Sequence, residues 1–140
     1  MKISNVELLR YSKQIILKKI GISGQKKISS TRVLIVGVGG LGCPLALYLT
    51  NTGIENIGIV DNDKVDVSNL NRQILFNKTD VGKYKVVQAR KFLKKINKKV
   101  KINIYKYWLT KKNIKNIISK YDIICDCSDN FTTRYLLNNF

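Results

Sequence analysis

A glycine-rich segment between an apolar run and a helical pattern constrains the fold of this chain more than any other feature. The segment Gly37-Val38-Gly39-Gly40-Leu41-Gly42 matches G-x-G-x-x-G, follows a β-branched run and opens a helical pattern. This order predicts a strand, a phosphate-binding turn and a helix. Gly37 would permit the tight turn, Gly39 would let the backbone approach a phosphate, and Gly42 would let the helix pack closely on the strand. The helix N-terminus would then offer free N–H groups to an anion.

The rest of the chain alternates between strand-like and helix-like patterns. We expect an amphipathic helix over 5–20, with Val6, Leu9, Ile16 and Ile20 on its apolar face, and a polar connector over 21–30. The expected strands are 32–38, 56–60, 100–108 and 121–127, and the expected helices are 41–52, 80–96, 111–120 and 131–138. The pattern predicts an α/β fold, a Rossmann-like parallel sheet with helices on both faces.

The chain is long enough for one domain with a single core. Within that domain we expect an N-terminal helix and connector over 1–30 and a nucleotide-binding unit over 31–140. In the strand order 3-2-1-4-5-6 the sheet would be truncated after its fourth strand, which would leave Ile123 and Cys125 at an edge.

Asp61 closes the second expected strand, where a carboxylate can accept hydrogen bonds from ribose hydroxyls. The glycine segment and Asp61 together fit NAD, FAD or ATP, and a glycine turn without a ligand remains the bland alternative. The polar stretch 61–79 is longer than most loops in a compact domain, which indicates a functional loop.

The charged residues of this loop and of the segments after it favour a triphosphate over a dinucleotide. Asp61 and Asp63 open the loop, Arg72 lies near its middle, and Lys85 follows it. Arg72 and Lys85 can neutralise phosphate charge, and Asn69 can donate a hydrogen bond to a phosphate oxygen. Asp129 follows the fourth strand and faces the same crevice, so it can hold Mg²⁺. We therefore expect ATP and Mg²⁺ as ligands.

The composition excludes some classes of protein and disfavours others. The net charge of +17 suggests nucleic-acid binding as a possible function. The basic residues are nearly all Lys, however, and they accompany many Asn and Ile residues, a composition that an A/T-rich genome explains. No run reaches the ~18–20 apolar residues that cross a bilayer, and no signal-peptide pattern is evident. We expect a soluble protein without a membrane or nucleic-acid partner, in the cytoplasm, or in the plastid stroma if the gene is organellar.

Three segments carry a specific resemblance to a known family. They are Arg10-Tyr11-Ser12-Lys13-Gln14, the stretch 68–73 and the pair Asp129-Asn130. With the glycine segment they resemble the adenylyltransferases that activate ubiquitin-like proteins, over nearly the whole chain. The molybdopterin-synthase adenylyltransferase is the most similar branch, and its thiamine-biosynthesis relative is close.

The resemblance implies a reaction, partners and a set of site residues. ATP would adenylate the C-terminal glycine carboxylate of a small ubiquitin-like sulfur-carrier protein, with release of pyrophosphate, in molybdenum cofactor biosynthesis, and the enzyme would be a homodimer. Arg10, Lys13, Arg72 and Lys85 would be the catalytic residues, and Asp129 would bind Mg²⁺. The nucleotide site would comprise Gly37, Gly39, Gly40, Gly42, Asp61, Asp63, Ser68, Asn69, Leu70, Asn71, Arg72, Lys85, Asp129 and Asn130.

The chain departs from the family pattern in two places. Lys13 stands where the family places an arginine that reaches into the partner subunit's ATP site, and lysine lacks the planar fork of arginine. Family members also continue beyond Phe140 with two C-x-x-C zinc pairs, which are absent from these 140 residues. A fragment of an active enzyme is the expectation. A non-catalytic remnant that binds ATP or a partner protein, and an NAD-dependent oxidoreductase, are the alternatives.

Overall fold

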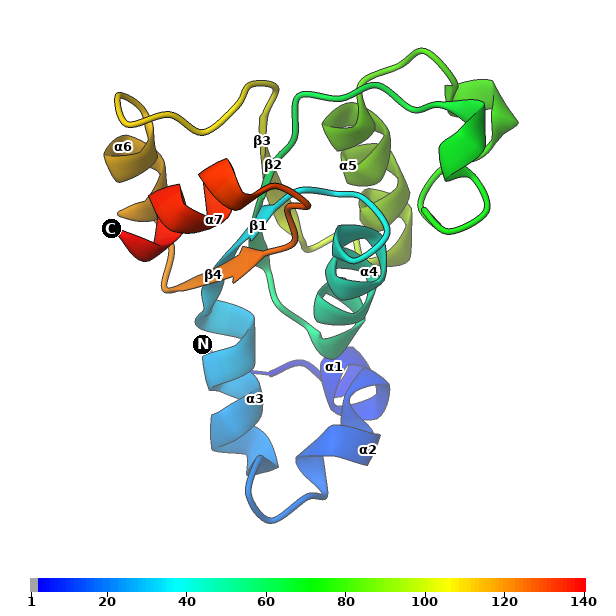
Figure 1. The fold of residues 1–140 in the computed structure, drawn as a ribbon. Coiled ribbons are helices and arrows are strands. Elements are labelled where there is room, and N and C mark those ends of the chain that lie inside the picture. The colour runs from blue at the N-terminus through cyan, green and yellow to red at the C-terminus, as the bar shows by residue number, and fades with distance from the viewer. Residues whose placement is uncertain (1–2) are drawn as a thin grey trace.

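The computed structural model describes residues 3–140, which form a four-stranded parallel sheet flanked by helices (Figure 1). The strands are β1 (Arg32–Val36), β2 (Asn56–Val60), β3 (Lys101–Tyr105) and β4 (Ile123–Asp126). The helices are α1 (Asn5–Arg10), α2 (Ser12–Ile15), α3 (Gly21–Ser30), α4 (Gly42–Thr52), α5 (Lys85–Ile96), α6 (Ile114–Ile118) and α7 (Phe131–Asn138), with 3-10 turns η1 (Val67–Asn69) and η2 (Lys78–Asp80).

The sheet has the strand order β3-β2-β1-β4, which confirms the predicted parallel topology. In register, Val36 lies opposite Val60 of β2 on one side and Asp126 of β4 on the other. The chain therefore runs outward from β1 through β2 to β3 and then returns past β1 to β4. This reversal is the switch point at which α/β sheets bind ligands, beyond the carboxyl ends of the strands.

Each face of the sheet carries its own apolar core. On one face the side chains of Val33, Ile35 and Ile59 pack against helices α4 and α5 through residues such as Ala46 and Leu93. On the other face Leu34, Val36 and Val60 pack with Leu109, with Ile117 of α6 and with Leu136 and Leu137 of α7. The two-sided burial explains why β1 and β2 read as continuous apolar runs, and it confirms helices on both faces.

The predicted start of α5 is wrong. The helix begins at Lys85, and residues 78–80 form the separate turn η2, which Asn77 caps by accepting from the Thr79 N–H at 2.9 Å. Gly82 lies between them with φ +80°, a left-handed conformation that breaks the helix.

The N-terminal segment differs most from its prediction. The expected helix over 5–20 is broken at Tyr11 and ends at Ile15, and the expected connector over 21–30 is helix α3. The expected apolar face is also wrong, because Val6, Leu9 and Ile16 are 77%, 79% and 72% exposed.

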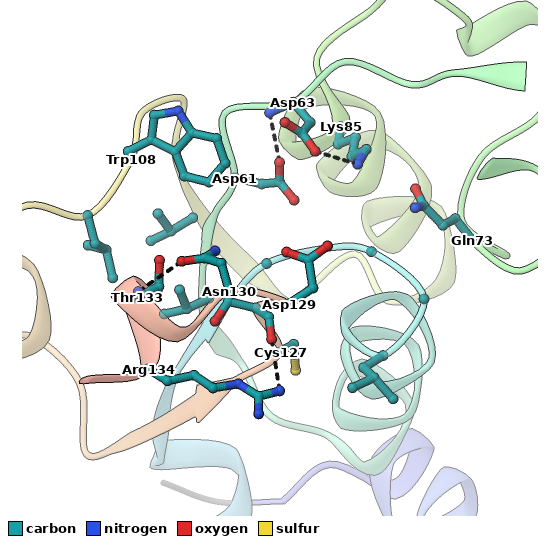
Figure 2. Close-up of a pocket in the computed structure, with 18 of the residues that line it drawn as sticks. Asp61, Asp63, Gln73, Lys85, Trp108, Cys127, Asp129, Asn130, Thr133 and Arg134 are labelled. Carbon is teal, nitrogen blue, oxygen red and sulfur yellow. Dashed lines mark hydrogen bonds and ion pairs between the residues drawn. The ribbon is translucent and has the colours of Figure 1, made fainter. Parts of the chain in front are cut away.

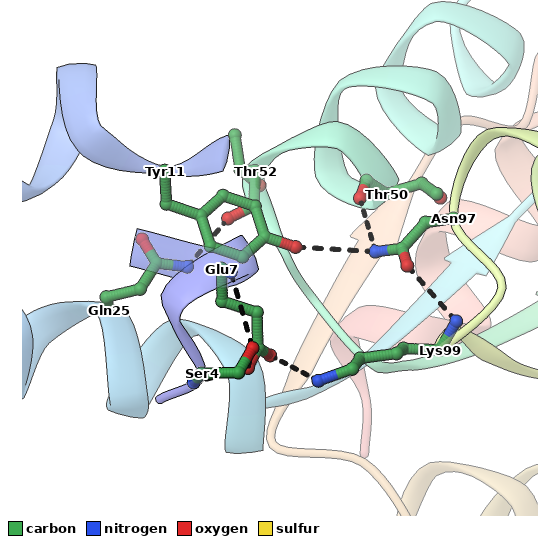
Figure 3. Close-up of polar contacts among 8 residues, drawn as sticks. All are labelled: Ser4, Glu7, Tyr11, Gln25, Thr50, Thr52, Asn97 and Lys99. Atoms are coloured by element: carbon green, nitrogen blue, oxygen red, sulfur yellow. Dashed lines mark hydrogen bonds and ion pairs between the residues drawn. The ribbon is translucent and has the colours of Figure 1, made fainter. Parts of the chain in front are cut away.

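Polar side chains join the N-terminal helices to the C-terminal ends of α4 and α5 instead (Figure 3). Gln14 and Gln25 donate to the Thr52 carbonyl at 2.8 and 3.0 Å, and Asn97 donates to the Tyr11 hydroxyl at 3.5 Å. A Cβ at Gly53, which has φ +99°, would lie 2.8 Å from both Gln25 Nε2 and Tyr11 Cζ. This close polar contact replaces the apolar packing that the sequence pattern had suggested.

Glu7 forms a second contact between the N-terminal helices and the rest of the fold, and the contribution of this contact to stability should depend on pH. Its carboxylate caps α1 with Ser4 and pairs with Lys99 Nζ at 2.6 Å, contacts that lower its pKa to about 2. A depressed carboxyl pKa stabilises the fold above the unfolded value, near 4.5, and the stabilisation disappears as the pH falls toward 2. Glu7→Gln should therefore lower the free energy of unfolding by about 1 kcal/mol at neutral pH. The variant should also lose less stability than the unchanged protein between pH 4.5 and 2. Denaturant titrations at several pH values measure both, and equal pH slopes for the two proteins would contradict the assignment.

No helix among residues 3–140 is long and apolar enough to cross a membrane.

Candidate functional site

A cavity of about 490 Å³ opens at the carboxyl ends of the strands, on the side of the glycine segment (Figure 2). Its walls come from the ends of β1, β2 and β4, the loop after β3, and the start of α7. Nine of the predicted site residues line it: Gly37, Gly39, Gly40, Asp61, Asp63, Arg72, Lys85, Asp129 and Asn130. The structure thus gathers residues from 37 to 130 of the chain around one space.

The glycine segment places backbone directly against the cavity. Gly37 has φ +90°, and a Cβ there would lie 2.8 Å from the Cys127 carbonyl oxygen. A Cβ at Gly42 would lie 1.9 Å from the Gly37 carbonyl oxygen, so only glycine lets α4 start this close to the turn. Gly42 does not line the cavity, whereas Gly39 and Gly40 do. A Cβ at Gly39 would meet only Gln73 Nε2, at 3.7 Å, so Gly39 presents open backbone to a ligand.

Asp61 is fixed at the end of β2 by two backbone donors. Its Oδ2 accepts from the Val38 N–H at 2.8 Å, and its Oδ1 accepts from the Asp63 N–H at 2.8 Å. Burial raises the pKa of this carboxyl group, while the two N–H donors act in the opposite direction. Each carboxylate oxygen keeps a second lone-pair position, so Asp61 can still accept from two ribose hydroxyls.

Lys85 brings a buried cation to the wall of the cavity. Its ammonium group lies 2.9 Å from Asp63 Oδ2, with the lysine side chain buried and the aspartate half-exposed. A buried charge needs a partner, and here Asp63 supplies it at the rim of the cavity. A phosphate entering the cavity would find a cation already held in place.

Arg72 is the member of the stretch 68–72 that lines the cavity. Its Nη1 donates to the Ser68 carbonyl and to Asn71 Oδ1, both at 3.0 Å, and its side chain lies over Gly40. Ser68, Asn69, Leu70 and Asn71 do not line the cavity of this chain. In this structure Ser68 and Asn71 therefore position the arginine, and the roles predicted for these four residues along the nucleotide remain predictions.

Asp129 and Asn130 follow β4, and their side chains differ in the hydrogen bonds that they form. Asn130 Oδ1 accepts from the Thr133 N–H at 2.9 Å and so caps α7, which leaves its amide nitrogen for a ligand. The Asp129 carboxylate is exposed to the cavity and has no hydrogen-bond or ion-pair partner within residues 3–140 (Figure 2).

This setting of Asp129 fits Mg²⁺ bound together with a nucleotide. The described part of the chain contains no group of three or more His, Cys, Asp or Glu residues that would hold a metal alone. Mg²⁺ commonly takes one or two carboxylates and completes its shell with substrate phosphates and water. Asp129, which has no side-chain partner among residues 3–140 and lines the same cavity as Arg72 and Lys85, meets that requirement.

Eleven further residues line the cavity that were not among the predicted site residues. They are Val36, Leu41, Val60, Gln73, Tyr107, Trp108, Leu109, Cys127, Ser128, Thr133 and Arg134. Gln73 is buried with its Oε1 unpartnered, and Arg134 Nη2 donates to the Ser128 carbonyl at 3.2 Å. The aromatic pair after β3 belongs to a short segment with no charge pattern, so only the fold reveals that it reaches the site.

Arg10 and Lys13 do not line the cavity. Both are exposed on α1 and α2, away from the carboxyl ends of the strands (Figure 1), and Arg10 Nη2 donates to the Ile96 carbonyl at 3.2 Å. The catalytic role predicted for Arg10 and Lys13 therefore requires the cavity of a second molecule, and not the cavity of their own chain.

The comparisons with known proteins agree on one family. A profile described as the ThiF family matches residues 11–140. The adenylyltransferase and sulfurtransferase MOCS3 of Culex quinquefasciatus is 46% identical over 99% of this chain, and the protein named UBA4 of Debaryomyces hansenii is 44% identical over 97%. The chain spans about a third of the length of these relatives, 32% and 31% respectively.

Solved structures show the same fold with nucleotides bound. The tRNA N6-threonylcarbamoyladenosine dehydratase TcdA of E. coli, in complex with AMP, gives a TM-score of 0.85 at 27% identity over 93% of this chain and 53% of TcdA. A second structure of TcdA contains ATP, again at 27% identity. E. coli MccB with AMPCPP and MccA gives 0.83 at 26% identity over 99% of this chain and 40% of MccB.

Proposed function

This chain belongs to the ThiF family, and from that membership we propose that it adenylates the C-terminal carboxylate of a small ubiquitin-like protein with ATP and Mg²⁺. One arrangement in the structure carries the proposal. Open glycine backbone, two cations and a carboxylate without a partner among residues 3–140 surround a single cavity. The relatives named adenylyltransferases and the nucleotide complexes of TcdA and MccB support it.

The proposed chemistry needs positioning and charge balance more than acid–base catalysis. A carboxylate is already ionised near neutral pH, so it attacks the α-phosphorus without a general base while pyrophosphate leaves. Asp61 would orient the ribose, and the backbone of Gly39 and Gly40 would lie along the phosphates. Arg72 and Lys85 would balance the charge on the phosphates and on the leaving group. Mg²⁺, held by Asp129 and the phosphates, would supply further neutralisation of that charge.

We assign the substrate to the ubiquitin-like sulfur carriers, most closely those of molybdenum cofactor biosynthesis. The MOCS3 and UBA4 relatives are named both adenylyltransferase and sulfurtransferase, which favours a sulfur carrier as the acceptor of AMP. The thiamine-biosynthesis carrier is the second candidate within the same chemistry.

We further propose that the enzyme is a homodimer in which Arg10 and Lys13 serve the nucleotide site of the partner subunit. Both residues are exposed and lie away from their own cavity, on α1 and α2. Val6 and Leu9 of α1 and Ile16, directly after α2, are also exposed. A dimer contact over this surface would bury those side chains and carry the two cations toward a second molecule.

The test is ATP–pyrophosphate exchange in the presence and absence of the carrier protein. We expect retention of ATP in equilibrium dialysis, and exchange that requires both Mg²⁺ and the carrier. Arg72→Ala should slow exchange about tenfold or more, because a cation beside the phosphates is lost. ATP binding without exchange would favour the non-catalytic remnant. Binding of NADH that is indifferent to Arg72→Ala would favour the oxidoreductase.

A further inference from the structure

The cavity has a charged end and an apolar end. Asp63 and Lys85 lie toward the former, and Trp108 lies on the opposite side of Asp61 from Lys85 and Gln73 (Figure 2). Three apolar residues that pack together in the core on one face of the sheet also line the cavity, and one of them, Leu109, directly follows Trp108 in the chain: Val36, Val60 and Leu109. A nucleotide with its ribose on Asp61 and its phosphates on the glycine segment directs its base toward this apolar end.

Trp108 is held in place although 55% of it is exposed. With its amide oxygen facing the indole, Asn62 accepts from Trp108 Nε1 at 3.1 Å and donates to the Lys106 carbonyl at 3.0 Å. Asn113 Nδ2 donates to the Trp108 carbonyl at 2.9 Å. Asn62 directly follows Asp61, the residue expected to bind the ribose. Its side chain therefore links the indole of Trp108 to the end of β2 that carries Asp61.

A large aromatic ring fixed at a cavity wall but left exposed lacks the partner that would bury its face. The indole N–H is already satisfied, so the open part of the ring offers apolar surface and π-electrons rather than a hydrogen bond. A flat heteroaromatic base is the part of a nucleotide that matches such a surface. This reasoning rests on the nucleotide site of the proposed function and adds the group that reads the base.

We infer that Trp108 is the wall on which the purine base of the nucleotide stacks, and that it gives the site its preference for ATP over phosphate chains that lack a base. Asn62 acts as the positioning residue, because its amide bonds both the indole N–H and the Lys106 carbonyl and so fixes the ring. The recognition is therefore by stacking, and the charged end binds the phosphates independently.

Binding measurements with two ligands test the inference. In equilibrium dialysis Trp108→Ala should bind ATP about tenfold more weakly, while binding of tripolyphosphate stays within about twofold of the unchanged protein. Trp108→Phe should recover most of the ATP affinity because a ring is restored. Tyr48→Ala, which removes an exposed aromatic ring on α4 outside the cavity, is the matched control and should bind both ligands normally.

Fluorescence gives a readout that a merely structural role would not produce. Trp108 is the single tryptophan of the chain, so any change in tryptophan emission reports on this residue. ATP should quench the emission and tripolyphosphate should not. Retention of ATP without quenching, or an equal loss of both ligands in Trp108→Ala, would overturn the inference and leave the proposed function standing. Failure of the unchanged protein to retain ATP in dialysis would overturn both.

Discussion

Replacing Asp129 by asparagine should slow carrier-dependent ATP–pyrophosphate exchange by at least about 100-fold while leaving the fold intact. The side chain has no partner within residues 3–140, so its loss removes nothing that stabilises the protein. Its proposed contribution is to hold Mg²⁺ against the phosphates, and an amide is a much poorer ligand for that ion. Exchange assays and thermal unfolding of the same preparation measure the two effects separately.

Asp122→Asn is the matched control, because it removes a carboxylate just before β4, at the opposite end of the strand that Asp129 follows. Asp122 pairs with Arg32 at 2.6 Å, outside the cavity, so exchange should stay within about twofold of the unchanged enzyme. We expect the unfolding temperature of Asp129→Asn to stay within about 2 °C. If Asp129→Asn exchanged pyrophosphate at a near-normal rate, the assignment of the metal ligand would be wrong.

Gly42→Ala should have the largest effect on stability. The added Cβ would lie 1.9 Å from the Gly37 carbonyl oxygen and 2.9 Å from the Gly37 carbonyl carbon, and neither backbone atom can rotate away. Relief requires α4 to move relative to the turn after β1, at a cost of about 3 kcal/mol in the free energy of unfolding. For a chain of this size the unfolding temperature should fall by about 10 °C.

Gly39→Ala separates binding from stability within the same motif. Its Cβ would meet only Gln73 Nε2, at 3.7 Å, so the protein should unfold at nearly the normal temperature. The methyl group would nevertheless project where phosphate is proposed to approach the backbone, so ATP should bind at least about tenfold more weakly. Dialysis and calorimetry on the pair distinguish the two roles, and a Gly42→Ala protein as stable as Gly39→Ala would contradict the packing argument.

The sheet was predictable because its signals are local and mutually consistent. The runs that became β1 and β2 are apolar on both faces, and the glycine segment fixes how α4 follows β1. The N-terminal helices were not predictable in detail, because spacing alone does not reveal whether an apolar side chain has anything to pack against. Val6 and Leu9 follow helical spacing but lie exposed, while the polar Gln25 is buried against the Thr52 carbonyl.

The residues that line the cavity were predictable where a charged side chain follows the end of a strand. Asp61 and Asp129 each follow a parallel strand, and such ends meet at one edge of the sheet. Trp108 carried no such signal, since an aromatic residue near a strand is more often part of a core. Ser68 and Asn71 accept hydrogen bonds from Arg72, a contact that the sequence pattern did not indicate, and their predicted place along the nucleotide stays a prediction.

The strand order also has a consequence for how the protein folds. The elements from β1 to β3 follow one another in the chain, whereas β4 pairs with β1 only after a loop of some 90 residues has closed, as the pairing of Val33 with Ile123 shows. Contacts between distant parts of a chain form late and slow the folding of α/β proteins. The glycine turn and Asp61 can thus assemble early, while Asp129 arrives with the last strand. On this account Asp129, the proposed Mg²⁺ ligand, would reach the cavity only with the last strand, so a partly folded chain would lack the complete site proposed for ATP and Mg²⁺.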